Sequence, residues 1–190
     1  MTPEAKRKIS HWCILLVPFF YVFVFTDKET VILLLGIVIL IVTAFELLRQ
    51  KDEKLNQKIL KIFDGIYRED EVKKTSTLIY TLSGIFFTIL FFEKKIAVLA
   101  ILFLTFGDGF AALVGERYGR HKMFRKKSWE GVITNLCTCL VVGFVFSFFY
   151  QLNVLQIILG SLAAAVIEIL PVKDNLLIPV FSALIMKLIR

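Results

Sequence analysis

The sequence has few of the residues on which several common kinds of site depend. Its 190 residues include only three cysteines and two histidines, and two histidines are too few for a zinc site. It contains no Walker-type glycine loop and no serine–histidine triad. Cys13, Cys137 and Cys139 lie in apolar runs, and the last two fall on different faces of an expected helix. We therefore expect three packing cysteines, without a disulfide or a metal pair.

Charge is also scarce over long stretches of the chain. The sequence is 57% hydrophobic and its mean hydropathy is +0.76, whereas soluble domains use about 45–50% apolar residues. This composition predicts an integral membrane protein. The net charge of +7 comes from loops between apolar runs, which suits lipid headgroups and membrane topology. We expect the bilayer as a partner and no nucleic acid.

Seven apolar segments are candidate membrane helices, because about 20 residues at roughly 1.5 Å each cross the hydrocarbon core. The first follows a basic flank and reaches Asp27 without a small-x-small cleavage site, so we expect it to be retained. The others are residues 30–48, 77–92, 96–115, 132–150, 154–170 and 176–189. We predict an all-α integral membrane protein, a single polytopic bundle of about seven transmembrane helices. Five or six full spans with a re-entrant piece fit almost as well.

The basic residues predict the orientation. With seven spans, all but five of the 23 lysines and arginines fall on the side of the N-terminus, and by the positive-inside rule that side is cytoplasmic. We expect one domain over residues 1–190 in the cell (inner) membrane or its equivalent, with an amphipathic loop at 49–76 and a catalytic loop at 116–131. In the first loop, apolar residues at helical spacing predict a helix on the membrane surface. They are Leu55, Ile59, Ile62, Phe63 and Ile66.

Ionisable residues in apolar segments cost about 2.5–3.5 kcal/mol each at the bilayer centre, so each needs an explanation. The alternating direction of the spans brings the few that occur to the cytoplasmic face, where His11 also enters. They are Glu46, Asp108 and Glu168, followed by Asp174 and Asn175. This convergence predicts a single site at that face.

Asp108 is followed by small residues at helical spacing, namely Ala112, Gly115 and Gly119. Such a stripe is typical of close packing between membrane helices, within one chain or in a homodimer. A packing surface does not explain the acid, however. A magnesium ion that bridges phosphate oxygens needs a carboxylate and space for close approach. An ion pair with a lysine or arginine is the alternative for Asp108.

The basic loop ends in Lys126, Lys127 and Ser128, directly before an apolar helix. Ser128 is an expected N-cap, and Glu130 is favourable in the first turn. Free backbone N–H groups there, with lysines beside them, predict an anion site. The alternative is ordinary positive-inside charge with a helix cap.

The run GDGFAALVGERYGRHK followed by KKSWEG resembles the signature of the CTP-dependent membrane lipid-alcohol kinases, the group of dolichol kinase, phytol kinase and yeast-type diacylglycerol kinase. The matching residues are Asp108, Ala111 or Ala112, Gly115, Gly119, Lys127, Ser128, Glu130 and Gly131. Weaker matches are Arg7-Lys8 with His11, Arg68-Glu69, and Glu168 with Asp174-Asn175 and Pro179.

The resemblance implies a kinase that moves the γ-phosphoryl group of CTP to the hydroxyl of a membrane lipid alcohol, with Mg²⁺ as cofactor. The alcohol would be a polyprenol or dolichol, phytol, geranylgeraniol or diacylglycerol. The implied catalytic residues are Asp108, Lys127, Glu168 and His11, with His11 and Glu168 as candidate bases. The implied metal ligands are Asp108, Glu168 and Asp174. The implied nucleotide-binding residues are Arg7, Lys8, Gly115, Gly119, Lys126, Lys127, Ser128, Gly131 and Asn175.

Two other functions remain open. One is cytidylyl transfer of the CDP-diacylglycerol synthase type, although the glycine-histidine-glycine and paired-aspartate signature associated with those enzymes is absent near the C-terminus. The other is a small transporter or a non-catalytic scaffold. A transporter is expected to hold its ionisable residues near the midplane, whereas this sequence gathers them toward one face.

Overall fold

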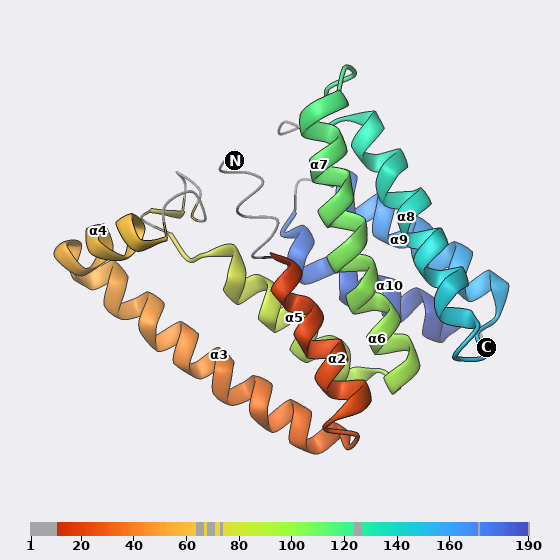
Figure 1. The fold of residues 1–190 in the computed structure, drawn as a ribbon, viewed down its shortest axis with the longest axis horizontal. Coiled ribbons are helices and arrows are strands. Elements are labelled where there is room, and N and C mark those ends of the chain that lie inside the picture. Colours follow the sequence, from red (N-terminus) through yellow and green to blue (C-terminus); the bar gives the residue numbers. More distant parts are fainter. Residues whose placement is uncertain are drawn as a thin grey trace.

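The chain folds into helices joined by short loops (Figure 1). The computed structural model describes residues 11–63, 67, 71–72, 74–123, 127–170 and 172–189. Within these ranges there is no β-strand, only an isolated bridge between Lys122 and Ser128, so the predicted all-α class is confirmed. The helices are η1 (Cys13–Leu15), α2 (Leu16–Phe23), α3 (Lys28–Lys51), α4 (Glu53–Ile62), α5 (Thr77–Phe91), α6 (Lys94–Leu102), η3 (Phe103–Asp108), α7 (Gly109–Tyr118), α8 (Trp129–Ser147), α9 (Val154–Ile169) and α10 (Asp174–Leu188).

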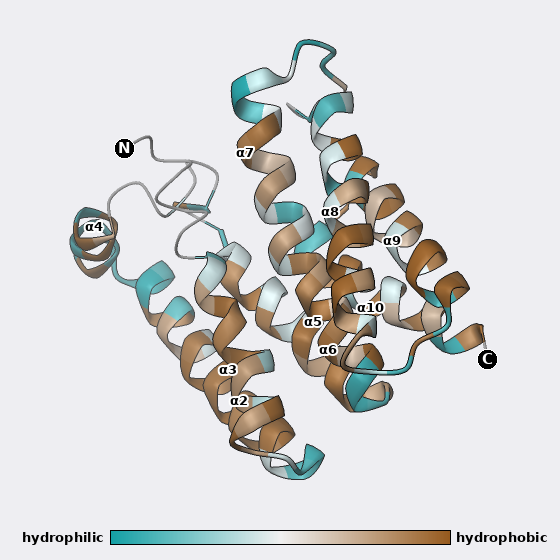
Figure 2. Ribbon diagram, turned by 45° about the vertical axis from the view of Figure 1, so that its right-hand side comes forward, coloured by the Kyte–Doolittle hydropathy of each residue, from teal (hydrophilic) through white to brown (hydrophobic). Residues whose placement is uncertain are grey.

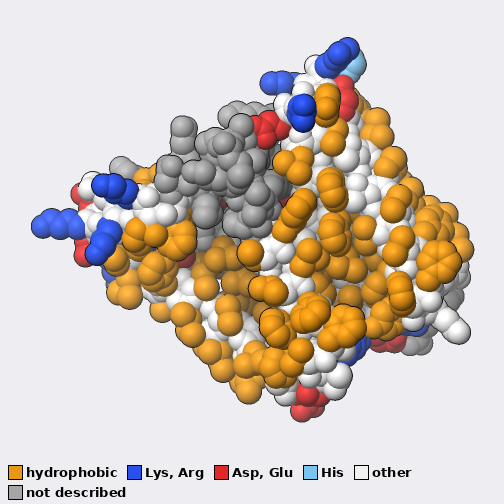
Figure 3. Space-filling view, in the orientation of Figure 1, with side chains coloured by type: hydrophobic (Ala, Val, Ile, Leu, Met, Phe, Trp, Pro, Cys, Tyr) orange, Lys and Arg blue, Asp and Glu red, His pale blue; other side chains and the backbone are white. Residues whose placement is uncertain are grey.

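Three helices are long and apolar enough to cross a membrane: α3, α8 and the continuous helix Lys94–Tyr118 that α6, η3 and α7 form together. The shorter apolar helices are Cys13–Phe23, Thr77–Phe91 and Val154–Ile169. Figure 2 shows apolar residues along the helices and hydrophilic ones toward their ends. In Figure 3 apolar side chains cover the middle of the visible face, and charged ones gather at its extremities. The predicted apolar segments are thus helical, while the number of spans stays a prediction.

The continuous helix Lys94–Tyr118 forms the centre of the bundle. Within its most apolar 18-residue window 72% of the residues are buried, against 17% for α3. Ile101, Phe103 and Leu104 are fully buried, because α5, α8, α9 and α10 surround this helix. In contrast, α3 lies at the margin and packs on α5 and α4 (Figure 1). One side of α3 is therefore left open to lipid.

A π-helical turn, η3, interrupts the central helix directly before α7, and Asp108 is its last residue. Turns of this kind insert an extra residue into an α-helix and are frequent at functional sites. Gly107 and Gly109 flank Asp108, and each allows a close approach. A Cβ on Gly107 would lie 2.6 Å from Cys139 Sγ, and one on Gly109 would lie 2.7 Å from Trp12 Nε1. This turn was not predicted from the sequence.

Two helix starts follow from local sequence. Asp27 caps α3 by accepting a hydrogen bond from the Thr30 N–H at 2.8 Å. Ser128 caps α8 by accepting one from the Gly131 N–H at 3.2 Å, as predicted. The expected amphipathic helix is present as α4, which buries Ile59 and exposes Ile62, while Ile66 lies outside the described residues.

Candidate active site

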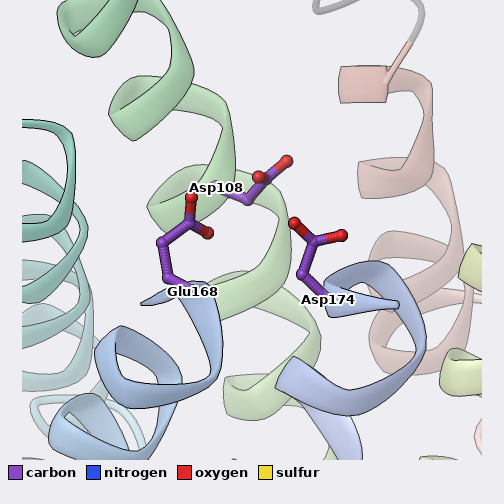
Figure 4. A group of neighbouring side chains, drawn as sticks. All are labelled: Asp108, Glu168 and Asp174. Atoms are coloured by element: carbon purple, nitrogen blue, oxygen red, sulfur yellow. The ribbon is translucent and has the colours of Figure 1, made fainter. Parts of the chain in front are cut away.

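Three carboxylates from three different helical segments meet in one place. Asp108 ends η3, Glu168 lies near the end of α9, and Asp174 begins α10. One oxygen of each lies within 4.8 Å of the others, and Figure 4 shows the side chains directed toward a common space. Asp108 and Glu168 are 7% and 6% exposed. Residues distant in sequence therefore form an acidic cluster with two buried members and one half-buried member, Asp174, which we call the carboxylate cluster.

Lys127 supplies a positive charge to the carboxylate cluster. Its Nζ lies 2.9 Å from Glu168 Oε1 and 2.7 Å from Asp174 Oδ2, and it donates to the backbone oxygen of Glu168 at 2.7 Å. Burial by itself would lower the pKa of Lys127, but the two carboxylates outweigh it and raise that pKa above its usual value. One ammonium thus contacts two of the three carboxylates, those of Glu168 and Asp174.

The donor set of the carboxylate cluster fits a hard divalent cation. Carboxylate oxygens are the ligands that Mg²⁺ prefers in proteins. Among the described residues, Glu168 Oε2 is buried and has no hydrogen-bond partner. Such an atom is costly to bury unless a ligand satisfies it. The cluster can therefore hold Mg²⁺ through Asp108, Glu168 and Asp174.

The start of the described chain lies against the carboxylate cluster. His11 Nε2 is 3.7 Å from Asp108 Oδ2, and the rings of Trp12 and Phe110 are 5.7 Å apart. His11 is thus the predicted base candidate that contacts Asp108. Arg7, Lys8 and Lys126, expected to bind the nucleotide, lie outside the described residues, as do Arg68 and Glu69.

The glycines of the signature bring α7 and α8 together. A Cβ on Gly119 would overlap the backbone oxygen of Gly115 and lie 2.6 Å from Ser128 Oγ. On Gly131 it would lie 3.0 Å from the oxygen of Ala111, which is 3% exposed and is the alanine at this contact. This geometry is that of helix packing within the chain. The glycines of the stripe, Gly115 and Gly119, are therefore used inside one chain and do not support a dimer interface. A role for these glycines in nucleotide binding stays a prediction.

An anion site was predicted at the start of α8 because its backbone N–H groups were expected to be free, and this prediction is wrong in part. The N–H of Trp129 donates to the backbone oxygen of His121 at 3.1 Å, and that of Gly131 donates to Ser128 Oγ. The Trp129 bond forms because the loop folds back on the helix end, as the bridge between Lys122 and Ser128 shows, whereas the Gly131 bond is the predicted N-cap of Ser128. An anion at this loop would therefore be bound mainly by the cationic side chains of the loop.

A cavity of about 480 Å³ reaches the carboxylate cluster. Its polar lining includes His11, Asp108, Asp174 and Asn175, and its apolar walls include Ile14, Ile41, Val42, Phe45 and Leu78. The volume is within the range of small-molecule sites, about 300–1,000 Å³. A ligand with a hydrocarbon chain and a polar head group matches this lining.

A second polar cluster on the same cavity is centred on Arg49 and was not predicted from the sequence. This side chain is fully buried and lies 2.7 Å from Glu46 Oε2. It also donates to Asn56 and to the backbone oxygens of Glu71, Val72 and Lys74. Glu46 therefore has its own partner and is not part of the carboxylate cluster. The spacing of three residues between Glu46 and Arg49 on one helix was the available signal.

The Tyr67 hydroxyl donates to Glu46 Oε1 at 3.1 Å. Burial, followed by the charge of Glu46, raises the pKa of Tyr67 to about 12, so this phenol stays neutral and remains a donor. Together with Arg49, it joins the segment before α5 to the end of α3.

The fold and site define an all-helical protein with three helices long and apolar enough to cross a membrane, and with an acidic, lysine-containing centre beside a cavity with apolar walls. The chain belongs to the cytidylyltransferase family, whose sequence model matches residues 9–171. The resemblance to the CTP-dependent lipid kinases is confirmed by relatives named as a phytol kinase and as a CTP-dependent diacylglycerol kinase.

Three relatives show how far the similarity extends. The uncharacterized protein RP860 of Rickettsia prowazekii is 30% identical over 185 residues, 93% of this chain and 89% of the relative. The phytol kinase of Synechocystis is 39% identical over 99 residues, 47% of this chain and 42% of the relative. The CTP-dependent diacylglycerol kinase 1 of Saccharomyces cerevisiae is 23% identical over 209 residues, 96% of this chain and 72% of the relative. No solved structure matches the chain at a significant level.

Proposed function

We propose that this protein is a CTP-dependent kinase that transfers the γ-phosphoryl group to the hydroxyl of a membrane lipid alcohol. The observation that carries this proposal is the meeting of Asp108, Glu168, Asp174 and Lys127 beside a cavity with apolar walls. Phytol kinases and a CTP-dependent diacylglycerol kinase among the relatives support the same chemistry. The alcohol would come from the bilayer and the nucleotide from water, so the site belongs at the interface between them.

Phosphoryl transfer requires positioning and neutralisation of charge more than covalent catalysis by the protein. Asp108, Glu168 and Asp174 would hold Mg²⁺. When bound, Mg²⁺ supplies positive charge at the phosphate oxygens. Lys127, whose ammonium contacts Glu168 and Asp174 and whose side chain is 25% exposed, would bind the phosphate oxygens directly. Lys126, Arg7 and Lys8 are proposed to bind the rest of the triphosphate.

The acceptor hydroxyl must lose its proton during the transfer. His11 and Glu168 are the candidates to receive it. His11 Nε2 lies near Asp108 Oδ2 at 3.7 Å, and Glu168 keeps Oε2 unbonded among the described residues while Oε1 contacts Lys127. A base must reach the hydroxyl within hydrogen-bonding distance. Comparing the pH dependence of His11→Gln and Glu168→Gln, each with its own wild-type control, would distinguish them.

The site is proposed to face the cytoplasm in a bundle of about seven spans. All but five of the lysines and arginines fall on the predicted cytoplasmic side, and a soluble nucleotide is available there. Cysteine accessibility in sealed vesicles tests the orientation: a cysteine at Arg120 should react from the cytoplasmic side, and one at Glu93 from the other.

Cytidylyl transfer to an acidic lipid is the second candidate, favoured by the description of the family. CTP labelled at one phosphate separates the two reactions. A kinase puts the γ label into the lipid, whereas a cytidylyltransferase puts the α label there. A transporter would need its ionisable residues near the midplane with access from both sides, and it would move its substrate without chemical change.

A further inference from the structure

The cavity beside the carboxylate cluster joins two surfaces of different character. Near Asp108 and Asp174 it is polar, and along α3 and α5 it is lined by Val42, Phe45 and Leu78. We propose that this cavity receives a lipid alcohol with a single hydrocarbon chain, and that Asn175 accepts the hydrogen bond of its hydroxyl. This inference rests on the proposed function, since it assigns the acceptor subsite of the same reaction.

The apolar wall on α3 opens toward the bilayer. Ile41 and Phe45 line the cavity, yet they are 64% and 41% exposed. Asp108 at the polar end is only 7% exposed. Because α3 lies at the margin of the bundle (Figure 1), a hydrocarbon chain can enter from the side while its head reaches the acids. The substrate is therefore oriented with its hydroxyl toward Asp108 and its hydrocarbon chain along α3.

Most hydroxyl groups around the cavity are already bonded within the protein. Thr81 Oγ1 donates to the backbone oxygen of Thr77 at 3.0 Å, and Thr77 Oγ1 donates to Glu71. The Tyr67 hydroxyl donates to Glu46. The hydrogens of these three hydroxyl groups are therefore already used inside the protein and are not available to a ligand while these bonds are intact.

Two polar atoms on the cavity lining remain unbonded. Among the residues that the structure describes, Ser76 Oγ and Asn175 Oδ1 are buried and have no hydrogen-bond partner. Ser76 is 5% exposed and Asn175 is 8% exposed. A hydroxyl contributes one donor and accepts as well, so it can satisfy an amide oxygen. Asn175 lines the same cavity as Asp108 and Asp174, so it belongs to the end of the cavity where the reacting hydroxyl is needed.

The size and the polar groups of the cavity distinguish alcohols with one hydrocarbon chain from alcohols with two. An alcohol with one hydrocarbon chain has no polar group besides its hydroxyl. A diacylglycerol also carries two ester carbonyls, and each loses its bonds to water on burial. Ser76 Oγ is an unbonded hydroxyl among the described lining residues, and the cavity, of about 480 Å³, has less room for two long hydrocarbon chains than for one. The cavity therefore favours the one-chain alcohol.

Photo-crosslinking tests the cavity without depending on catalysis. The probe is a long-chain primary alcohol with a diazirine in its chain, applied to the full protein in phospholipid nanodiscs. We expect labelled peptides from α3 and α5. Val42→Trp should fill the cavity and reduce the labelling about tenfold or more. Leu40→Trp makes a similar change on the 71% exposed side of α3 and should keep it. Equal labelling in the two variants would contradict the proposal.

Competition against the same probe tests the two chemical claims. The unlabelled alcohol should compete about tenfold better than its methyl ether, and Asn175→Leu should abolish this preference while Ser76→Ala reduces it less. A diacylglycerol should compete about tenfold less well than the one-chain alcohol. A diacylglycerol that competes equally, or an Asn175→Leu variant that keeps the full preference, would overturn the assignment.

The outcomes also separate this inference from the proposed function. If the probe labels α3 and α5 with the expected preferences but no γ-phosphoryl group reaches the alcohol, the cavity is an alcohol site and the kinase proposal fails. If phosphorylation occurs while labelling maps elsewhere, the kinase stands and the cavity assignment is wrong.

Discussion

Lys127 and Glu168 are 41 residues apart in sequence, and the ammonium of the first lies 2.9 Å from Oε1 of the second. This ion pair joins the loop before α8 to the end of α9. It also leaves Glu168 with one bonded and one unbonded carboxylate oxygen among the described residues. The lysine thus occupies part of the space in which the proposed ligands, Mg²⁺ and phosphate, would meet.

Replacing Lys127 by methionine should destabilise the protein and make its stability depend on magnesium. The loss of charged hydrogen bonds should cost about 1.5–3 kcal/mol. Because the carboxylates then lack their cation, added Mg²⁺ should raise the unfolding temperature more than it does in the wild type. Thermal unfolding in detergent with and without Mg²⁺ measures both effects.

The control for this variant is Lys54→Met, which removes an exposed lysine from α4. It should change the unfolding temperature little and leave the effect of Mg²⁺ unaltered. If Lys127→Met responded to Mg²⁺ no more than Lys54→Met does, the carboxylate cluster would not be a cation site.

Arg49→Met should be strongly destabilising, by about 3–5 kcal/mol, since it leaves the buried carboxylate of Glu46 without its partner. Glu46→Gln combined with Arg49→Met should recover part of this loss. A double-mutant cycle from chemical unfolding gives the coupling between the two residues. Arg117→Met, at an exposed position, serves as the control. Additive effects of the two substitutions would show that the pair is not coupled.

Much of the fold could be predicted because the apolar segments are separated by charged loops. The helices α3, α5, α8 and α9 lie close to the predicted ranges. The π-helical turn at Phe103–Asp108 could not be predicted from the sequence. Its glycines pack against residues of other segments, Gly107 against Cys139 and Gly109 against Trp12. Periodicity in a single helix carries no information about such neighbours.

The site, like the fold, could be predicted only in part. Rare acids in apolar segments predicted that Asp108, Glu168 and Asp174 belong together, because each is costly to bury alone. The same reasoning grouped Glu46 with them, although Arg49 pairs with it in the structure. The N–H groups at the start of α8 were expected to be free, but the loop before α8 folds back and its His121 oxygen accepts from the N–H of Trp129, in addition to the predicted cap of Ser128 on Gly131. Which partner a polar group chooses depends on tertiary contacts.

Gly119→Ala should lower stability because its new methyl group would overlap the Gly115 oxygen and crowd Ser128 Oγ at 2.6 Å. We expect a loss of about 1–3 kcal/mol, the usual cost of overpacking. Gly36→Ala is the matched control, since its nearest contact would be Phe86 at 3.8 Å. There the substitution should be neutral or stabilising by up to about 1 kcal/mol. The unfolding temperatures of the two variants should therefore move apart, and a similar shift in both would contradict the close packing of α7 on α8.

Removal of divalent cations should abolish activity reversibly. After chelation, Mg²⁺ should restore phosphorylation of the lipid alcohol, and Ca²⁺ should restore it poorly because its larger, more flexible coordination suits phosphoryl transfer less well. Initial rates against free cation concentration measure this dependence. Asp174→Asn should shift the curve to higher Mg²⁺ concentration, by about 10–100-fold. Full activity in chelator would contradict the proposed role of the carboxylate cluster.

The most direct measurement follows the γ-phosphate of labelled CTP into lipid for purified wild type, Asp108→Asn and Glu29→Gln. Glu29 is exposed at the start of α3, and its replacement should leave the rate unchanged. The wild type should transfer the γ label and no α label, and Asp108→Asn should lose about 100-fold or more of this rate while staying folded. Transfer of the α label, or a normal rate in Asp108→Asn, would contradict a kinase centred on the carboxylate cluster.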